Sequence, residues 1–237
     1  MSGAPSRGRW PLRVALFACG AFVLGPAAAH YGIAPSFAGF VAFVAGGLLG
    51  LFNAIAGLVA FMRGARARGL AAVVLSEIPA LVLIYASASG LGKPLINDIS
   101  TDLSEPPTLV QAQSLPGNSG RDLVYPESFK EIVRAAYPDV KSLRLADPPD
   151  AVFARAVRLA QQRPGWEVTF VNGTSHVFEG VATSELFRFQ DDFIVRVRPD
   201  GAGSIVDMRS KSRDGQGDLG VNADRIRAFL VDLAKAS

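Results

Sequence analysis

The sequence predicts an N-terminal all-α transmembrane bundle of three helices, followed by an α+β domain with an antiparallel sheet. Three observations carry this prediction. Apolar residues make up 49% of the 237 residues and charged residues only 19%, which is unusual for a wholly soluble protein. The apolar excess lies within the first ninety residues, and the later part shows strand-like and helix-like patterns. The predicted regions are a membrane domain over 1–90, an irregular proline-rich tether over 91–140 partly packed on the domain, and the α+β domain over 141–237.

The membrane domain is predicted from three long apolar segments, residues 12–31, 37–62 and 70–88. Each reaches the ~20 residues that a helix needs to cross the hydrocarbon core. One cleavable signal peptide does not account for three such segments. Cytoplasmic loops collect Lys and Arg. Arg7, Arg9 and Arg13 precede the first segment, and Arg63, Arg66 and Arg68 lie between the second and third, whereas the loop around Pro35 between the first and second has no Lys or Arg. We therefore expect a multi-pass protein of the bacterial inner (plasma) membrane, with its N-terminus cytoplasmic and its C-terminal domain periplasmic.

The overall basic charge follows from this topology. Six arginines and one acidic residue precede residue 91, a balance of +5, whereas 18 basic and 20 acidic residues follow, a balance of −2. A concentrated basic patch, which nucleic-acid binding usually needs, is therefore not expected. The single cysteine, Cys19, lies in the first apolar segment, so the outer domain has no disulfide framework.

Two polar residues stand inside the apolar segments, Asn53 and Glu77. Both are ~14 Å from the cytoplasmic end at 1.5 Å per residue, so we expect them to hydrogen-bond across the bundle, with Glu77 protonated. A proton or ion role for Glu77, or different segment boundaries, is the alternative. Gly46 and Gly50 indicate close helix packing, either within the bundle or in a dimer, and the oligomeric state is not predicted.

The outer domain is predicted from local patterns in chain order. Residues 129–136 favour one or two helical turns, and 142–145 a first short strand. Residues 150–163 favour a helix that Pro164-Gly165 ends, 166–171 a strand, and 177–189 one or two strands. A hairpin over 193–198 and 204–210 and a final helix with Asn222 as its N-cap complete the domain. The order β-α-β-β-β-β-α predicts an antiparallel sheet with helices packed on one face.

The hairpin pattern also predicts a register. If Arg198 lies opposite Ile205, then Arg196 lies opposite Asp207. Alternation then places one set of side chains on the core face: Phe193, Val195, Val197, Val206 and Met208. Arg196, Asp207 and Arg209 share the opposite face, where an Arg–Asp pair stabilises a sheet by ~0.2–1 kcal/mol.

The segment 207–226, D-M-R-S-K-S-R-D-G-Q-G-D-L-G-V-N-A-D-R-I, concentrates arginines, aspartates and glycines between the last strand and the last helix. It closely resembles the C-terminal signature of the domain of unknown function 1499 family of bacterial and plant membrane-associated proteins. Residues 93–102, K-P-L-I-N-D-I-S-T-D, are similar to the opening motif of that family. The resemblance covers about residues 94–232 and implies no activity, because the family has none established.

The signature has two chemical interpretations. In the first, Arg209, Ser210, Ser212 and Arg213 cradle an anion such as a phosphate, a lipid headgroup or a carboxylate, since serine hydroxyls and arginine forks are suitable donors. In the second, which we favour, the polar residues lock the loop onto the sheet; this structural network comprises Arg196, Asp207, Asp218, Asn222 and Arg225, together with Arg213.

The sequence contains no residue pattern that indicates a catalytic site or a zinc site. His176 is the only histidine outside the membrane segments, no second histidine or cysteine completes a zinc site, and Asp191-Asp192 is interpreted as a turn between strands. No metal, cofactor or catalytic residue is predicted. We expect a non-catalytic envelope module that binds a partner protein or an anionic or lipidic ligand near the bilayer. The alternative is an unrecognised hydrolase or transferase acting on an envelope substrate.

Overall fold

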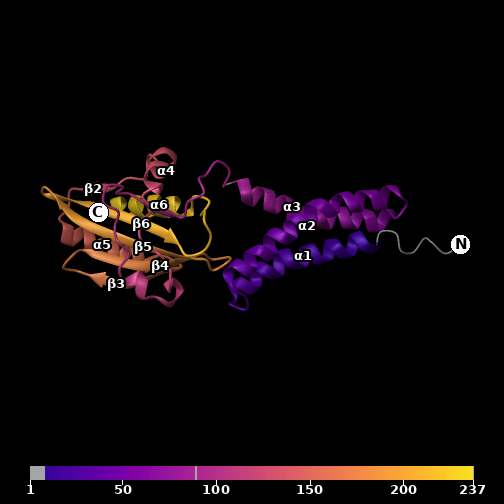
Figure 1. Cartoon of the computed structure of the whole chain (residues 1–237), viewed down its shortest axis with the longest axis horizontal. Helices are drawn as coiled ribbons and strands as arrows, with labels where there is room; N and C mark the ends of the chain where they lie inside the picture. The colour runs from indigo at the N-terminus through magenta and orange to yellow at the C-terminus, as the bar shows by residue number, and fades with distance from the viewer. Residues whose placement is uncertain (1–8, 89, 237) are drawn as a thin grey trace. The chain divides into compact units, whose positions relative to one another are not determined.

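The computed structural model describes residues 9–88 and 90–236, which form two compact units (Figure 1). The first unit comprises residues up to Leu91 together with Glu185–Arg188, and the second comprises Gly92–Ser184 and Phe189–Ser237. The predicted fold class, an N-terminal helical bundle followed by an α+β domain, is confirmed.

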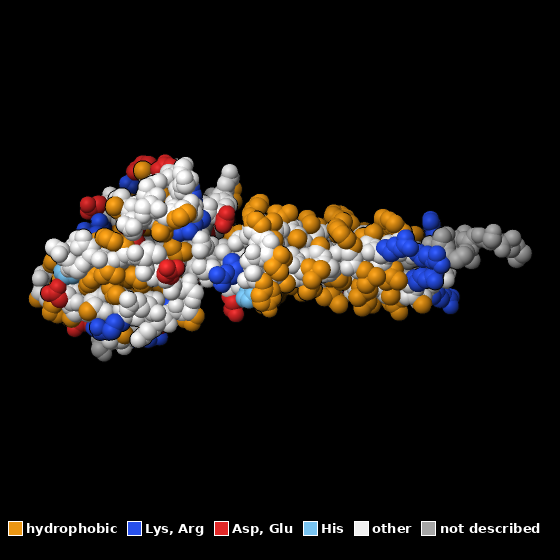
Figure 2. All heavy atoms as spheres, turned by 90° about the horizontal axis from the view of Figure 1, so that it is seen from below, with side chains coloured by type: hydrophobic (Ala, Val, Ile, Leu, Met, Phe, Trp, Pro, Cys, Tyr) orange, Lys and Arg blue, Asp and Glu red, His pale blue; other side chains and the backbone are white. Residues whose placement is uncertain are grey.

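The first unit consists of the helices α1 (Arg9–His30), α2 (Ser36–Met62) and α3 (Arg66–Ala88). All three are long and apolar enough to cross a membrane. Figure 2 shows apolar side chains along the surface of this bundle and basic side chains gathered at one end of it. That end contains the start of α1 and the turn between α2 and α3, where five of the predicted arginines lie; Arg7 lies outside the described residues.

The glycines of α2 serve packing inside the bundle. A Cβ added to Gly46 would lie 2.6 Å from the carbonyl oxygen of Ala18 in α1, and one on Gly50 would lie 2.5 Å from that of Ser76 in α3. Both separations are too short for a real carbon, so both positions require glycine for the helices to approach this closely. Gly46 and Gly50 therefore contact α1 and α3 of the same chain, which agrees with close packing within the bundle.

The predicted Asn53–Glu77 hydrogen bond is wrong. The buried Asn53 donates its Nδ2 hydrogens to the Pro11 carbonyl oxygen over 2.8 Å and to Ser76 Oγ over 2.9 Å. Glu77 is the next residue of α3, and its side chain is exposed on the bundle surface. Consecutive helical residues point about 100° apart, so Ser76 faces Asn53 from the predicted turn of α3, while Glu77 points to another face.

The second unit is built on one antiparallel sheet of six strands. Its path is β1 (Asp98–Ser100), β6 (Gly203–Ser212), β5 (Gln190–Asp200), β4 (Val177–Thr183) and β3 (Trp166–Asn172). β2 (Leu143–Leu145) also pairs with β6. The helices are α4 (Phe129–Ala136), α5 (Pro149–Gln162) and α6 (Val221–Lys235). The predicted order β-α-β-β-β-β-α is present from β2 to α6, and β1 is an additional strand.

The hairpin of β5 and β6 has the predicted register, with Arg196 opposite Asp207 and Val195 opposite Met208. The five predicted core residues of this hairpin are buried and pack with residues of α4, α5 and α6. This main core therefore lies between the sheet and the three helices. Aromatic rings join its layers, since Trp166 of β3 contacts both Phe193 of β5 and Phe229 of α6.

The start of α6 differs from the prediction. The cap position is Gly220, at φ 89°, and Asn222 lies inside the first helical turn. The carboxylate of Asp218 caps the helix, because it accepts hydrogen bonds from the Gly220 N–H over 2.9 Å and the Asn222 N–H over 2.8 Å. Asn222 is instead fully buried, and its side-chain amide forms hydrogen bonds with Ser210 and Ser212 of β6.

The segment expected as a tether is a layer of the fold. Residues 101–125 cover the sheet face opposite the helices and contain the 3₁₀ helices η1 (Gln111–Ser114) and η2 (Pro116–Asn118). A second, smaller core forms between this layer and the sheet from Leu109, Ala112, Leu123 and Ile194. The sheet is therefore covered on both faces, and we call residues 98–125 the covering segment.

Candidate functional site

The sheet face beneath the covering segment carries a layer of buried charges. Successive side chains of a strand point to opposite faces, so β6 places Asp207, Arg209 and Lys211 under the covering segment. All three are less than 9% exposed. Charged groups are buried at this level only when paired and hydrogen-bonded, so their partners define the site.

Arg209 is the centre of this layer and is 1% exposed. Its Nε and Nη2 donate to the two carboxylate oxygens of Asp98 over 2.9 and 2.8 Å. Its Nη1 donates to the Pro107 carbonyl oxygen over 3.0 Å, and Nη2 donates also to that of Leu123 over 2.7 Å. One arginine thus fixes strand β1 and two distant points of the covering segment.

Arg213 holds the other end of the covering segment. Its guanidinium forms a forked pair with Asp192, with Nη2 2.6 Å from Oδ1 and Nε 3.0 Å from Oδ2. Asp192 also accepts a hydrogen bond from Asn118 Nδ2 over 2.9 Å, and Arg121 donates to the Ser212 carbonyl oxygen over 2.7 Å. Asp191 and Asp192 therefore lie within β5, and their interpretation as a turn is wrong.

Ser210 and Ser212 point to the helix face of the sheet, away from Arg209 and Arg213. Ser210 Oγ donates to Asn222 Oδ1 over 2.7 Å, and Asn222 Nδ2 donates to Ser212 Oγ over 2.9 Å. Arg225 binds Ser210 and Asp191 on this same face. The four residues expected to bind one anion are thus split between two faces, because β6 continues to Ser212 instead of ending at the predicted Ser210.

A second ion-pair cluster lies nearer the hairpin turn. Arg196 and Arg198 both donate to Asp207 Oδ2, over 3.1 and 2.7 Å, and both donate to Asp102 Oδ2 over 3.0 Å. Burial opposes ionisation of Asp102, but hydrogen bonds from Ser104 and Glu105 and the Arg196 charge prevail and lower the pKa of this carboxyl. This cluster fixes the beginning of the covering segment.

Glu179 of β4 anchors the middle of the covering segment and is 1% exposed. Its Oε1 accepts hydrogen bonds from the backbone N–H groups of Val110 and Gln111 over 2.8 and 3.1 Å, and Oε2 accepts one from Ala112 over 2.8 Å. A carboxylate thus satisfies three donors at the start of η1, where no helical carbonyl is available.

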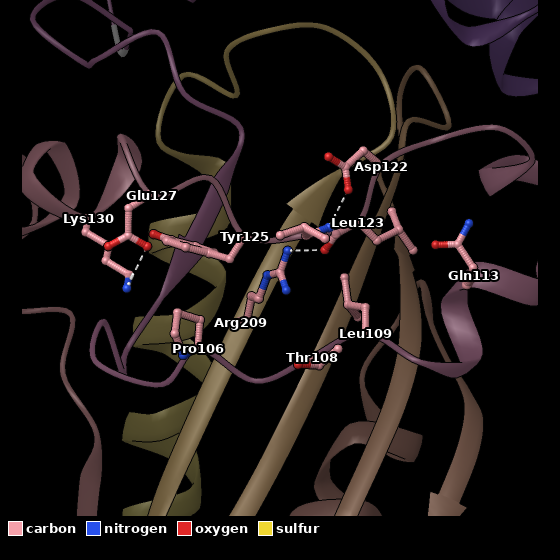
Figure 3. A pocket seen from close by; sticks show the side chains of 11 residues that line it. Pro106, Thr108, Leu109, Gln113, Asp122, Leu123, Tyr125, Glu127, Lys130 and Arg209 are labelled. Atoms are coloured by element: carbon pink, nitrogen blue, oxygen red, sulfur yellow. Dashed lines mark hydrogen bonds and ion pairs between the residues drawn. The ribbon is translucent and has the colours of Figure 1, made fainter.

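Beside Arg209 the covering segment leaves a cavity of about 400 Å³. Its lining includes apolar surface from Pro106, Leu109, Leu123, Val124 and the Tyr125 ring. Polar lining comes from Thr108, Gln113, Asp122, Glu127, Lys130 and Arg209. Figure 3 shows Glu127 and Lys130, which form an ion pair, on one side of Arg209, and Asp122 and Gln113 on the other.

Tyr125 is the distinctive group of this cavity. Its ring centroid lies 5.2 Å from the Arg209 guanidinium carbon. The hydroxyl is buried and has no hydrogen-bond partner among the described residues. Burial, followed by the charge of Asp98, raises the pKa of Tyr125, so the hydroxyl stays protonated and keeps its donor hydrogen. A buried donor without a partner is costly, so a further acceptor for this hydroxyl would stabilise the protein.

Charges of both signs lie at and beside the cavity. Arg209 and Lys211 share the single carboxylate of Asp98, which lies 3.1 Å from Lys211 Nζ. Arg209 uses four of its five N–H groups on Asp98, Pro107 and Leu123, which leaves one Nη1 hydrogen without a partner in the described part of the chain. The cavity therefore borders the Arg209 guanidinium, which keeps one unused N–H, and the ring of Tyr125, whose buried hydroxyl has no partner among the described residues.

Other chemistry finds less support. His176, in the turn after β3, lies 2.6 Å from Asp150 Oδ1 through its Nε2, and no serine hydroxyl is bonded to it within residues 9–88 and 90–236. Within the same residues, no cluster of three His, Cys, Asp or Glu side chains could hold a metal ion.

Several residues of the site were missed in the sequence: Asp98, Asp102, Tyr125, Glu179, Asp192 and Lys211. Asp98 and Asp102 stood inside the opening motif 93–102, which was assigned to a tether, so their partners on the sheet were not sought. Glu179 and Asp192 each follow the alternation of a strand, which is the one signal that could have placed them on the covered face.

Comparison with protein-family models finds a match over residues 98–233 to a family described as protein of unknown function (DUF1499). A comparison with curated proteins finds no match. The matched region contains the whole sheet, the covering segment and the cavity.

Proposed function

Because the chain belongs to the DUF1499 family, whose description gives no activity, we propose a function from the geometry of its own cavity. The second unit is a non-catalytic module, anchored by the helical bundle, that binds an anionic ligand with an apolar body beside Arg209. The observation that carries the proposal is Tyr125, whose ring lines the cavity and whose buried hydroxyl has no hydrogen-bond partner among the described residues.

The ligand class follows from the lining. The unused donors on Arg209 and Tyr125 suit acceptor oxygens, and the charge of the Arg209 guanidinium favours a carboxylate or phosphate over a neutral group. Leu109, Leu123 and Val124 offer apolar surface to the rest of the molecule. Asp122 and Glu127 add negative charge at the cavity, so the anionic group is best placed against Arg209. A cavity of about 400 Å³ is in the range of small-molecule sites.

Binding is favoured over catalysis for a chemical reason. An enzyme acting in this cavity would need a nucleophile or acid held by a base. Thr108 is the aliphatic hydroxyl of the lining, and no base is bonded to it in the described residues. Glu127 is held by Lys130 over 2.9 Å, which suits an ionised carboxylate more than a proton donor.

The ligand-binding test uses native mass spectrometry of the full chain, extracted from membranes in a mild detergent. Wild type is expected to retain an additional anionic mass. Tyr125→Phe removes only the donor hydroxyl, so it is expected to lose that mass while the thermal stability of the ligand-free protein stays equal or rises. The matched control is Tyr137→Phe, which removes a hydroxyl of the main core that is also buried without a partner in the described part of the chain.

A second pair of variants tests the place of binding. Thr108→Trp fills the cavity from an exposed position and is expected to abolish the additional mass, whereas Val110→Trp, two residues on and outside the lining, is not. The proposal would be contradicted if wild-type protein carried no additional mass, or if both Tyr125→Phe and Thr108→Trp retained it.

The same proposal places the module in the periplasm of a bacterial inner membrane, because the arginines at one end of the bundle favour the cytoplasmic side. Three spans with that end inside put everything after α3 outside the cytoplasm. Alkaline phosphatase fused to the C-terminus is expected to be active, and green fluorescent protein fused there is expected to be dark. The reverse pattern would invert the topology.

A further inference from the structure

One edge of the second unit exposes apolar side chains on two neighbouring loops. Leu95 is 74% exposed and Leu219 is 54% exposed. The Asp218 N–H donates to the Ile96 carbonyl oxygen over 3.1 Å, so the two leucines flank one backbone hydrogen bond. A Cβ added to Gly217 would lie 2.6 Å from Leu95 Cδ1, which shows that the loops touch. We call Leu95, Leu219 and the adjoining, exposed Val221 the apolar edge.

Leu219 is unfavourable at this position in water for two reasons. Its φ of 56° is in the left-handed region, which a leucine adopts at a cost that glycine avoids. Burial in the core does not offset this cost, since more than half of Leu219 is exposed. A contact between the Leu219 side chain and an apolar surface outside the domain would offset the cost of this backbone conformation and of the exposed side chain.

The length of the connecting chain indicates which surface that is. α3 ends at Ala88, and its 23 residues rise ~35 Å, enough for the ~30 Å hydrocarbon core. Leu95 follows Ala88 by seven residues, which reach ~25 Å at most when fully extended. We propose that the apolar edge docks on the bilayer surface, with Leu95, Leu219 and Val221 at the boundary between headgroups and acyl chains.

The charges beside the edge are compatible with a lipid surface. Lys93 is exposed and lies next to Gly220, where an added Cβ would meet its Cε at 3.3 Å, and its Nζ lies 5.6 Å from the centroid of the Tyr137 ring. A cation that lipid phosphates attract is therefore close to the edge. Asp214 is exposed on the same loop with the opposite charge, and Arg213 is already paired with Asp192. Docking therefore depends on apolar insertion, which the short connection to α3 makes an intramolecular event.

Site-directed spin labelling of the full chain in nanodiscs of phosphatidylethanolamine and phosphatidylglycerol tests this contact. In a Cys19→Ser background, nitroxides are placed at Leu219→Cys, at Leu95→Cys and, as the matched control, at Ala202→Cys. Ala202 is exposed in the turn between β5 and β6, at the far end of the ten-residue strand β6, ~30 Å from the edge.

Labels at Leu219 and Leu95 are expected to lose accessibility to a water-soluble nickel chelate and to gain accessibility to oxygen, whereas the Ala202 label stays accessible to nickel. Nickel accessibility at Leu219 equal to that at Ala202 would overturn the inference. Loss of both accessibilities, with dipolar broadening between labels of two chains, would also overturn it, because a second copy would then cover the edge. Neither result depends on whether the cavity binds a ligand.

Discussion

Replacing Arg209 with methionine is expected to lower the free energy of unfolding of the second unit by about 3 kcal/mol. Breaking one partner of a buried ion pair costs about 3–5 kcal/mol, because the remaining charge stays buried. The lower end applies here, since Lys211 remains 3.1 Å from Asp98 and still neutralises it. The carbonyl oxygens of Pro107 and Leu123 lose their donor as well. Chemical unfolding of the full chain, followed by the fluorescence of Trp166 in a Trp10→Phe background, measures the change.

The matched control is Arg144→Met, which removes an arginine from the same sheet. Arg144 pairs with Asp200 at the surface, and its side chain is 69% exposed, so the expected cost is at most about 1 kcal/mol. The double variant Asp98→Asn, Arg209→Met should lose less than the sum of its single variants, because it removes both partners. An Arg209→Met variant as stable as Arg144→Met would contradict the view that Arg209 fixes the covering segment.

The hairpin of β5 and β6 could be predicted in detail because its information is local. The Asp200–Gly203 turn fixes the pairing, and alternation of apolar residues then identifies the core face. The membrane helices were equally accessible, since length and composition decide them. In both cases residues close in sequence carry the whole signal.

The covering segment could not be predicted because its order depends on distant residues. Asp98 and Arg209 are 111 residues apart, and Val110 and Glu179 are 69 apart. Within the segment, prolines and polar residues have the composition of a loop. Its order comes from buried carboxylates and arginines of the sheet, which no local pattern of the segment reveals.

Arg209, Ser210, Ser212 and Arg213 were predicted to bind one anion for a related reason: the continuation of β6 was not recognised. Residues 209–213 have no apolar side chain, so the strand was predicted to end at Ser210. The strand continues because both of its faces are buried against polar partners, Asp98 on one side and Asn222 on the other. Polar residues buried on both faces hide the alternation on which strand prediction depends. Only Arg209 of the four lines the cavity.

Glu179 offers the sharpest test of how the covering segment is held. Glu179→Gln preserves the size of the side chain but turns Oε1 or Oε2 into a donor, which then faces a backbone N–H of η1. Hydrogen bonds to a charged group contribute about 1.5–3 kcal/mol, so we expect a local loss of about 2 kcal/mol. That loss corresponds to a roughly 30-fold fall in hydrogen-exchange protection at Val110, Gln111 and Ala112, since 1.4 kcal/mol is tenfold.

The location of the change decides its meaning. Glu167→Gln is the matched control, because Glu167 lies on the neighbouring strand β3 and is exposed, and it should leave the exchange pattern unchanged. If the covering segment opens on its own, the amides of β5 keep their protection in Glu179→Gln, while ligand retention falls because Leu109 and Gln113 line the cavity. Equal loss of protection throughout the sheet would instead show that the covering segment and the sheet unfold as one unit. That result would contradict the prediction that Glu179 holds the covering segment as a layer that opens separately from the sheet.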